Sequence, residues 1–146
     1  MDSEIESEIL KAREVIDSSN SFLLTCHVHP DGDALGSTLA MAHALKSAGK
    51  QVLATFPDPF VIPENLQKSL PGIELLKPKT EVIELGQTFD CIMTFDCGSV
   101  SRLTGLEPLI EASSIFINVD HHISNEKFGD INIIDATAAS SGSVVL

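Results

Sequence analysis

The amino-acid sequence predicts an α/β domain, built as an open parallel sheet of about five strands with helices on both faces. Three observations predict it. Short runs that are almost wholly apolar recur along the 146 residues, as in strands buried on both faces. Stretches with apolar residues at helical spacing alternate with these runs. Histidines and aspartates follow three of the runs, at the position where open parallel sheets bind ligands.

The N-terminal part predicts a helix followed by a buried strand. Residues 4–18 carry apolar side chains three or four positions apart, which is typical of an amphipathic helix. Residues 22–26 (FLLTC) are apolar apart from one threonine and predict a strand buried on both faces. That strand ends at His27.

The residues that follow predict a turn and a second helix. Pro30 and Gly32 interrupt regular structure. Asp33 is well placed to cap a helix over residues 34–48, because a short side-chain oxygen can accept the free N–H groups of the first turn. Gly49 is placed to end that helix.

The middle of the chain predicts two more strands separated by loops. Residues 51–56 predict the second strand. Four prolines then break the chain into loops, with a short helix over residues 64–70. Residues 90–95 (DCIMTF) predict the third strand, which ends at Asp96.

The last third predicts one helix, two strands and the start of another helix. Residues 107–112 predict a short helix, and residues 114–119 (SIFINV) predict the fourth strand, which ends at Asp120. Residues 131–134 predict a short fifth strand. Residues 136–146 predict a loop that enters an apolar helix, so we expect the domain to be truncated there.

Composition limits the classes of function. A net charge of −12 provides no electrostatic footprint for long DNA or RNA, although it is also common in ordinary acidic proteins. The absence of Trp and Tyr leaves few platforms for base stacking. A small anionic substrate stays compatible, because divalent ions would reverse the local charge. No apolar run approaches the ~20 residues of a membrane span.

The three cysteines are Cys26, Cys91 and Cys97, and each lies in or beside an apolar run. An odd number in such places favours buried thiols in a reducing compartment over a disulfide framework. The acidic N-terminus lacks the basic start and apolar stretch of a signal peptide. These features predict a cytoplasmic protein.

The most informative feature is a set of metal-ligand side chains at three strand ends. His27, with Asp31 and Asp33 close behind it, follows the first strand, Asp96 follows the third, and His121 lies at the end of the fourth. Like charges on one rim are unfavourable unless cations lie between them, which predicts a two-metal hydrolytic site. Asp31 would serve one ion and Asp33 the other, with Asp96 as the bridge. Mixed carboxylate and imidazole ligands suit manganese, magnesium or iron.

Other polar residues leave alternatives open. His29 and His43 are expected to be solvated. Arg102 could contact a phosphate in a bidentate manner or have a surface or helix-capping role. Asp135 and the serines at 140–141 could contact a substrate, and turn chemistry explains them equally well.

Three motifs in this order resemble those of the DHH phosphoesterases. They are HVHPDGDALGS at residues 27–37, DCGS at residues 96–99 and DHH at residues 120–122. That superfamily includes RecJ-like single-strand exonucleases, oligoribonuclease/pAp phosphatases, cyclic-dinucleotide phosphodiesterases and family II inorganic pyrophosphatases. The segment HHISNEKFGDIN at residues 121–132 is most similar to the oligoribonuclease/pAp phosphatase branch. The resemblance extends over residues 20–146.

The resemblance implies a Rossmann-like DHH domain with two manganese ions, for which Mg²⁺ or Co²⁺ are alternatives. It implies that His27, Asp31 and Asp96 are ligands of one ion. It implies that Asp33, Asp96 and His121 are ligands of the other.

The resemblance also assigns two catalytic residues. His122 would contact the substrate phosphate or assist the leaving group. Asp120 would orient a histidine, as carboxylates behind metal ligands do.

The implied function is hydrolysis of short oligoribonucleotides, of 3′-phosphoadenosine 5′-phosphate (pAp), or of both, by attack of hydroxide held between two metal ions. Alternatives are a cyclic-dinucleotide phosphodiesterase, a single-strand exonuclease, an inorganic pyrophosphatase, or a metal-binding fragment without turnover. The expected partner is a small nucleotide or short oligonucleotide, not a membrane or a long duplex, with a homodimer as an open alternative.

The family pattern continues with a fourth-motif aspartate and a C-terminal substrate-binding domain, and residues 1–146 contain neither. These residues are therefore expected to form an N-terminal DHH domain that is weakly active or inactive by itself.

Overall fold

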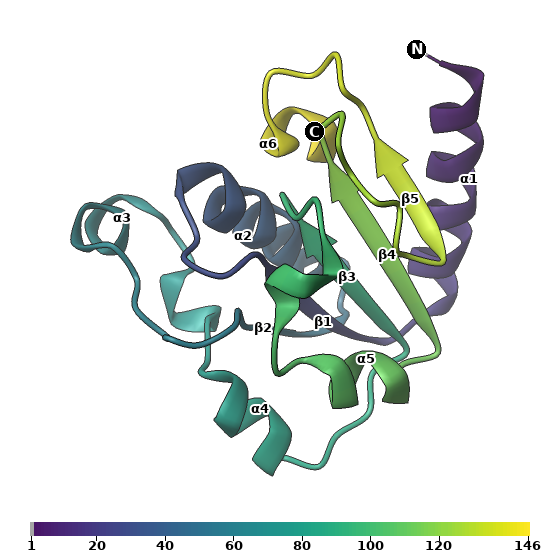
Figure 1. Cartoon of the computed structure of the whole chain (residues 1–146). Coiled ribbons are helices and arrows are strands. Elements are labelled where there is room, and N and C mark those ends of the chain that lie inside the picture. The colour runs from purple at the N-terminus through teal and green to yellow at the C-terminus, as the bar shows by residue number, and fades with distance from the viewer. Residues whose placement is uncertain (1) are drawn as a thin grey trace.

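A computed structural model describes residues 2–146. Its centre is one five-stranded sheet in which every neighbouring pair of strands is parallel (Figure 1). The strands are β1 (Ser21–Cys26), β2 (Gln51–Ala54), β3 (Cys91–Phe95), β4 (Ile115–Asp120) and β5 (Ile131–Ile134). The predicted parallel sheet is confirmed. The second strand is two residues shorter than expected.

The strand order is β2-β1-β3-β4-β5. The chain moves from β1 outward to β2, then crosses back to β3 on the other side of β1 and continues outward to β5. The direction of winding therefore reverses between β1 and β3. In open parallel sheets the crevice that binds ligands lies at such a reversal, beyond the carboxyl ends of the strands. Here those ends lead directly to His27 and Asp96.

Helices cover both faces of the sheet, as predicted (Figure 1). The helices that pack on one face are α1 (Ser3–Ser18), α2 (Gly32–Ser47), α3 (Glu64–Ser69) and α6 (Ser141–Val145). The other face carries α4 (Lys79–Glu84), which was not predicted, and α5 (Glu107–Ala112). Two 3₁₀ turns, Ile73–Leu75 and Val100–Leu103, complete the elements. None of the helices within residues 2–146 is long and apolar enough to span a membrane.

The core has two layers because strand side chains alternate between the faces. Phe22 and Leu24 of β1 pack beneath α1 and α2, whereas Leu23 packs beneath α4 and α5. All five residues of β3 are buried. A central strand covered on both faces cannot move easily, so the side chains that follow β3 start from a rigid support.

One prediction about α2 is wrong. The helix begins at Gly32, and its N-terminal cap is Asp31, not Asp33. The Asp31 carboxylate accepts the N–H of Ala34 at 2.9 Å, from a residue whose backbone is extended. Asp33 lies in the first turn of the helix, and its carboxylate is therefore free to bond elsewhere.

Candidate metal centre

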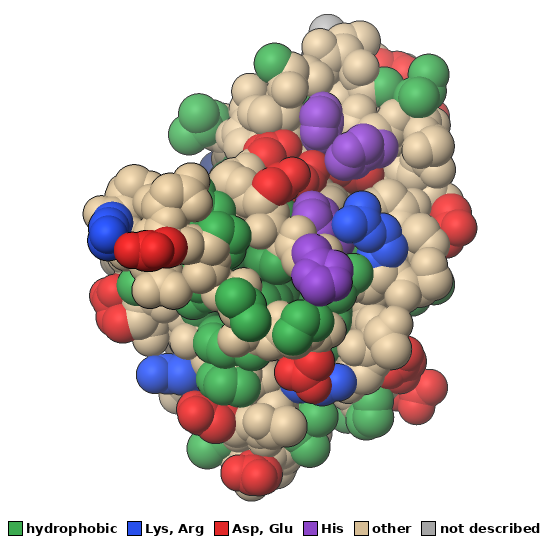
Figure 2. Space-filling model, turned by 60° about the vertical axis from the view of Figure 1, so that its left-hand side comes forward, with side chains coloured by type: hydrophobic (Ala, Val, Ile, Leu, Met, Phe, Trp, Pro, Cys, Tyr) green, Lys and Arg blue, Asp and Glu red, His purple; other side chains and the backbone are tan. Residues whose placement is uncertain are grey.

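The ends of β1, β3 and β4 bring the predicted ligands together on one rim of the sheet. His27 follows β1, Asp96 follows β3 and His121 follows β4. Asp31 and Asp33 reach the same rim from the start of α2. Figure 2 shows purple histidines and red carboxylates gathered on this face, with a blue basic side chain beside them.

Asp96 lies at the centre of the cluster and is only 3% exposed. Its Oδ2 is 3.5 Å from His27 Nε2, and its Oδ1 is 3.4 Å from His121 Nε2. The two oxygens of one carboxylate therefore face two different imidazoles. The backbone of Asp96 has a left-handed φ of +57°, which sets the direction of the side chain as the chain leaves β3.

Two further carboxylates complete two groups that share Asp96. Asp31 Oδ1 is 3.9 Å from His27 Nε2, and Asp33 Oδ2 is 3.6 Å from His121 Nε2. Ligand atoms that each lie about 2.0–2.3 Å from one ion are about 3–4 Å apart. The spacing and the mixed oxygen and nitrogen donors therefore fit two divalent ions of the manganese or magnesium type.

The His27 ring is held so that one nitrogen faces the carboxylates. Nδ1 lies 2.6 Å from the carbonyl oxygen of Val28, which assigns the proton to Nδ1 and leaves Nε2 as a metal donor. The hydrogen bond with Asp96 raises the pKa of His27 above its ordinary value, against burial, which lowers it. The Arg102 guanidinium is 3.2 Å from the same Nδ1. An Nδ1 that donates to Val28 cannot also accept from Arg102.

The first turn of α6 contributes residues whose role was left open by the sequence. The Asp33 carboxylate accepts the N–H groups of Ser141 and Gly142, both at 2.9 Å. Burial would raise the pKa of Asp33, but these hydrogen bonds outweigh it and the pKa is lowered. The Ser141 hydroxyl donates to Asp96 Oδ1 at 3.0 Å and lies 3.3 Å from Asp120 Oδ1. In the sequence, the only local signal for these N–H donors was that small residues begin the helix.

A second hydrogen-bonded group lies beside the candidate metal ligands. His122 Nδ1 is 2.7 Å from Asp120 Oδ1, and Asp120 is fully buried. Asn125, which sequence reasoning missed, donates to Asp120 Oδ2 at 2.8 Å and to the carbonyl oxygen of Cys97 at 3.0 Å. The His122 side chain is 46% exposed, so its other edge is open to a ligand. This geometry suits a histidine oriented by a carboxylate.

Other polar residues lie outside the cluster. His29 and His43 are exposed, as expected. Asp135 accepts the N–H and hydroxyl of Thr137, which is the turn chemistry that the sequence offered as one of two explanations.

The three cysteines are buried free thiols, as the sequence predicted. Burial is the main cause that raises the pKa of Cys97 to about 11 and that of Cys91 to about 12. These thiols are packing groups and contribute no thiolate to the metal site.

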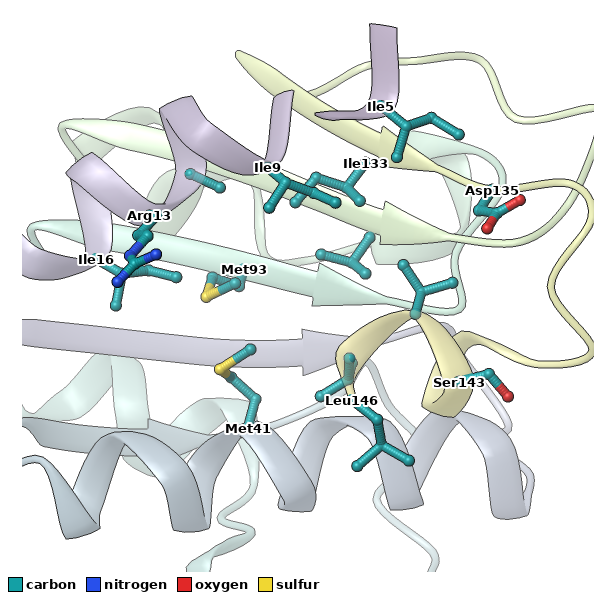
Figure 3. Close-up of a pocket in the computed structure, with 14 residues that line it drawn as sticks. Ile5, Ile9, Arg13, Ile16, Met41, Met93, Ile133, Asp135, Ser143 and Leu146 are labelled. Atoms are coloured by element: carbon teal, nitrogen blue, oxygen red, sulfur yellow. The ribbon is translucent and has the colours of Figure 1, made fainter. Parts of the chain in front are cut away.

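An apolar cavity of about 430 Å³ lies away from this rim, between α1, α2, α6 and the sheet (Figure 3). Ile9, Met41 and Met93 line it, with Arg13 and Asp135 near its edges. None of the residues that form the metal cluster lines this cavity. Most of the side chains that line it are apolar, so it offers packing surface.

The raised pKa of His27 leads to a prediction for metal binding. Only the neutral imidazole can bind a metal, so protons compete with the ion. We expect Mn²⁺ affinity to fall as pH drops through the raised pKa of His27, at a higher pH than for an ordinary histidine. Asp33, whose pKa is lowered, stays ionised in this range. Calorimetric titration from about pH 8 down to pH 5 measures the effect.

His27→Asn should weaken binding and flatten this dependence on pH, whereas His29→Asn should leave both unchanged. An equally steep dependence in His27→Asn would show that another group competes for the proton.

The chain was compared with known proteins. The model of the DHH family, N-terminal domain, matches residues 21–146. The chain is 30% identical over 139 residues to the bifunctional oligoribonuclease and PAP phosphatase NrnA of Thermus thermophilus, covering 95% of this chain and 38% of that protein. It resembles the crystal structure of an exopolyphosphatase-related protein from Bacteroides fragilis with a TM-score of 0.86 and 26% identity, covering 96% of this chain and 42% of that one. The chain therefore spans about two fifths of the length of each.

Proposed function

Because the chain belongs to the DHH family, we propose that it carries the metal centre of a manganese-dependent phosphoesterase that hydrolyses short oligoribonucleotides, pAp, or both. The observation that carries this proposal is Asp96, whose two oxygens face the imidazoles of His27 and His121. The name of the Thermus thermophilus relative, an oligoribonuclease and PAP phosphatase, supports the substrate class. The family model describes an N-terminal domain, so the proposed activity is that of the whole protein in which these residues act.

Five residues would hold two ions. His27, Asp31 and Asp96 would bind one, and Asp33, Asp96 and His121 would bind the other. Mn²⁺ is proposed, with Mg²⁺ or Co²⁺ as alternatives that these ligands also suit. When bound, the ions would activate water for attack on phosphorus and offset the charge that develops on the phosphoryl oxygens.

Residues that do not bind the ions would orient His122, which would transfer the proton. His122 would protonate the leaving oxygen from the ring edge that faces solvent, because its Nδ1 is engaged by Asp120. Asn125 would fix Asp120 through a hydrogen bond of 2.8 Å. A ring held in this way loses little freedom when substrate binds.

The charge of the protein favours small substrates. A net charge of −12 repels long polyanions, whereas a short one can be held by local ions. The buried free thiols support a reducing compartment, and we place the proposed activity in the cytoplasm.

A substrate comparison tests the proposal. The complete protein with Mn²⁺ should hydrolyse pAp or short oligoribonucleotides faster than cyclic dinucleotides, pyrophosphate or long single-stranded DNA, all measured at one salt concentration. A metal chelator should abolish the hydrolysis of every substrate. Fastest cleavage of long DNA would indicate a single-strand exonuclease, and fastest cleavage of pyrophosphate would indicate a pyrophosphatase. Either result would overturn the proposed substrate class.

A further inference from the structure

A small polar cavity of about 210 Å³ opens beside the metal cluster. It is separate from the larger apolar cavity. Because His122 lines it, the cavity adjoins the candidate metal ligands. Its lining residues are Gly98, Ser99, Arg102, His122, Ser124 and Glu126. The only permanently charged cation among them is Arg102.

Arg102 is exposed, and within residues 2–146 it forms no ion pair with a carboxylate. Its Nη2 is 3.2 Å from His27 Nδ1 and 3.5 Å from the carbonyl oxygen of Val28. Arg102 lies beside a carboxylate cluster, in a chain of net charge −12, but it does not bond to those carboxylates. Most of its N–H donors are therefore free. Figure 2 shows this face with blue beside purple.

The backbone places Arg102 firmly. Its N–H donates to the carbonyl oxygen of Ser99 at 3.1 Å, and its carbonyl oxygen accepts from the N–H of Val28 at 3.1 Å. The 3₁₀ turn that carries Arg102 is therefore tied to the segment that follows His27.

The His27 ring separates Arg102 from the cluster. Its Nδ1 faces Arg102 and Val28, while its Nε2 faces Asp96 and Asp31. A phosphate bound by Arg102 would therefore be a different one from the phosphate at the candidate metal ligands, because the His27 ring lies between them.

We propose that this cavity binds the second phosphate of the substrate, the one that is not attacked, with Arg102 as its main ligand. The inference rests on the proposed function and adds to it a site for the second phosphate of a nucleoside 3′,5′-bisphosphate, or for the neighbouring phosphodiester of an oligonucleotide. The guanidinium provides a planar pair of donors for phosphate oxygens. Ser99 and Ser124 line the same cavity, and the Ser124 hydroxyl adds a donor that carries no charge.

Glu126 opposes this binding. Glu126 lines the same cavity, and its backbone N–H donates to the carbonyl oxygen of Gly98 at 2.9 Å. A carboxylate close to a phosphate repels it, so the cavity should prefer a phosphodiester or a monoanion over a fully ionised dianion. Removal of this charge should therefore have the opposite effect to removal of the Arg102 charge.

The test uses the complete protein with Mn²⁺ and three related nucleotides: pAp, adenosine 3′-phosphate and adenosine 5′-phosphate. Wild type should prefer pAp to either monophosphate. Arg102→Gln should lower kcat/KM for pAp about 10- to 100-fold, mainly through KM, and most of the preference should be lost. Arg102→Lys should recover part of it, and Glu126→Gln should lower the KM for pAp. Arg13→Gln on α1 is the matched control and should match wild type.

Metal binding separates this role from a structural one. If Arg102 acted only by positioning His27, Arg102→Gln would weaken Mn²⁺ binding and lower kcat on all three nucleotides equally, and the inference would be overturned. Retention of the pAp preference by Arg102→Gln would overturn it too, while the proposed function would stand. If wild type hydrolyses no nucleotide, the proposed function and this inference fail together.

Discussion

Asp96→Asn is expected to reduce turnover about 10³-fold or more, because the loss of metal-assisted charge stabilisation amounts to several kcal/mol. Asp96 is the residue whose two oxygens face two imidazoles. An amide keeps the shape but offers one neutral oxygen, so it cannot bridge two ions. Steady-state rates on pAp and a dinucleotide, at saturating Mn²⁺, measure the loss.

Metal binding gives a second measurement that does not depend on turnover. Mn²⁺ at about 100 times its dissociation constant should stabilise wild type by about 2.7 kcal/mol. For a chain of this length, that raises the Tm by about 5–10 °C. Asp96→Asn should lose most of this shift, whereas the exposed Asp17→Asn should retain it. An equal shift in Asp96→Asn and wild type would exclude Asp96 as the bridging ligand.

His122→Asn is expected to slow hydrolysis of nucleotides roughly 10²- to 10⁴-fold, the usual contribution of a general acid. The ribose oxygen is a poor leaving group and needs a proton, which His122 would supply from its exposed edge. In a p-nitrophenyl phosphate ester the leaving group is p-nitrophenolate, which can leave without that proton. The same variant should therefore lose much less activity on the aryl ester, and the ratio of the two rates measures the role of His122.

A competing role for His122 follows from its position. Its Nδ1 is 3.8 Å from Asp96 Oδ1, and both belong to one group of side chains that could hold a metal ion. If His122 were a metal ligand, His122→Asn would weaken Mn²⁺ binding and slow both kinds of substrate alike. Unchanged Mn²⁺ affinity with selective loss on nucleotides would support the role in proton transfer. His29→Asn serves as the control, since His29 is exposed nearby.

Strands and their ends could be predicted because their signals are local. A run that is apolar throughout indicates burial on both faces, and the first polar residue after it indicates the edge of the sheet. This reasoning located His27, Asp96 and the end of β4, and all three lie on one rim. The resemblance of the three motifs to the DHH phosphoesterases then named the family that the comparison found.

Capping could not be assigned from local sequence. Asp31 and Asp33 flank Gly32, and both have a side chain that can cap a helix. Which of the two is the cap depends on α6. Its Ser141 and Gly142, more than a hundred residues away in the sequence, donate to Asp33, and Asp31 remains as the cap. Asn125 was missed for the same reason, because its partners, Asp120 and Cys97, come from different strand ends.

The sequence by itself determined the parallel α/β class, the family and the set of candidate ligand side chains, since each depends on residue type and spacing along the chain. Only the tertiary structure decided that β1 lies beside β3, and therefore that one oxygen of Asp96 faces His27 and the other faces His121. Only the structure placed Arg102 against the far side of the His27 ring. Hydrophobic periodicity specifies which residues are buried but not which strands are neighbours, and the distances between ligands depend on the neighbours.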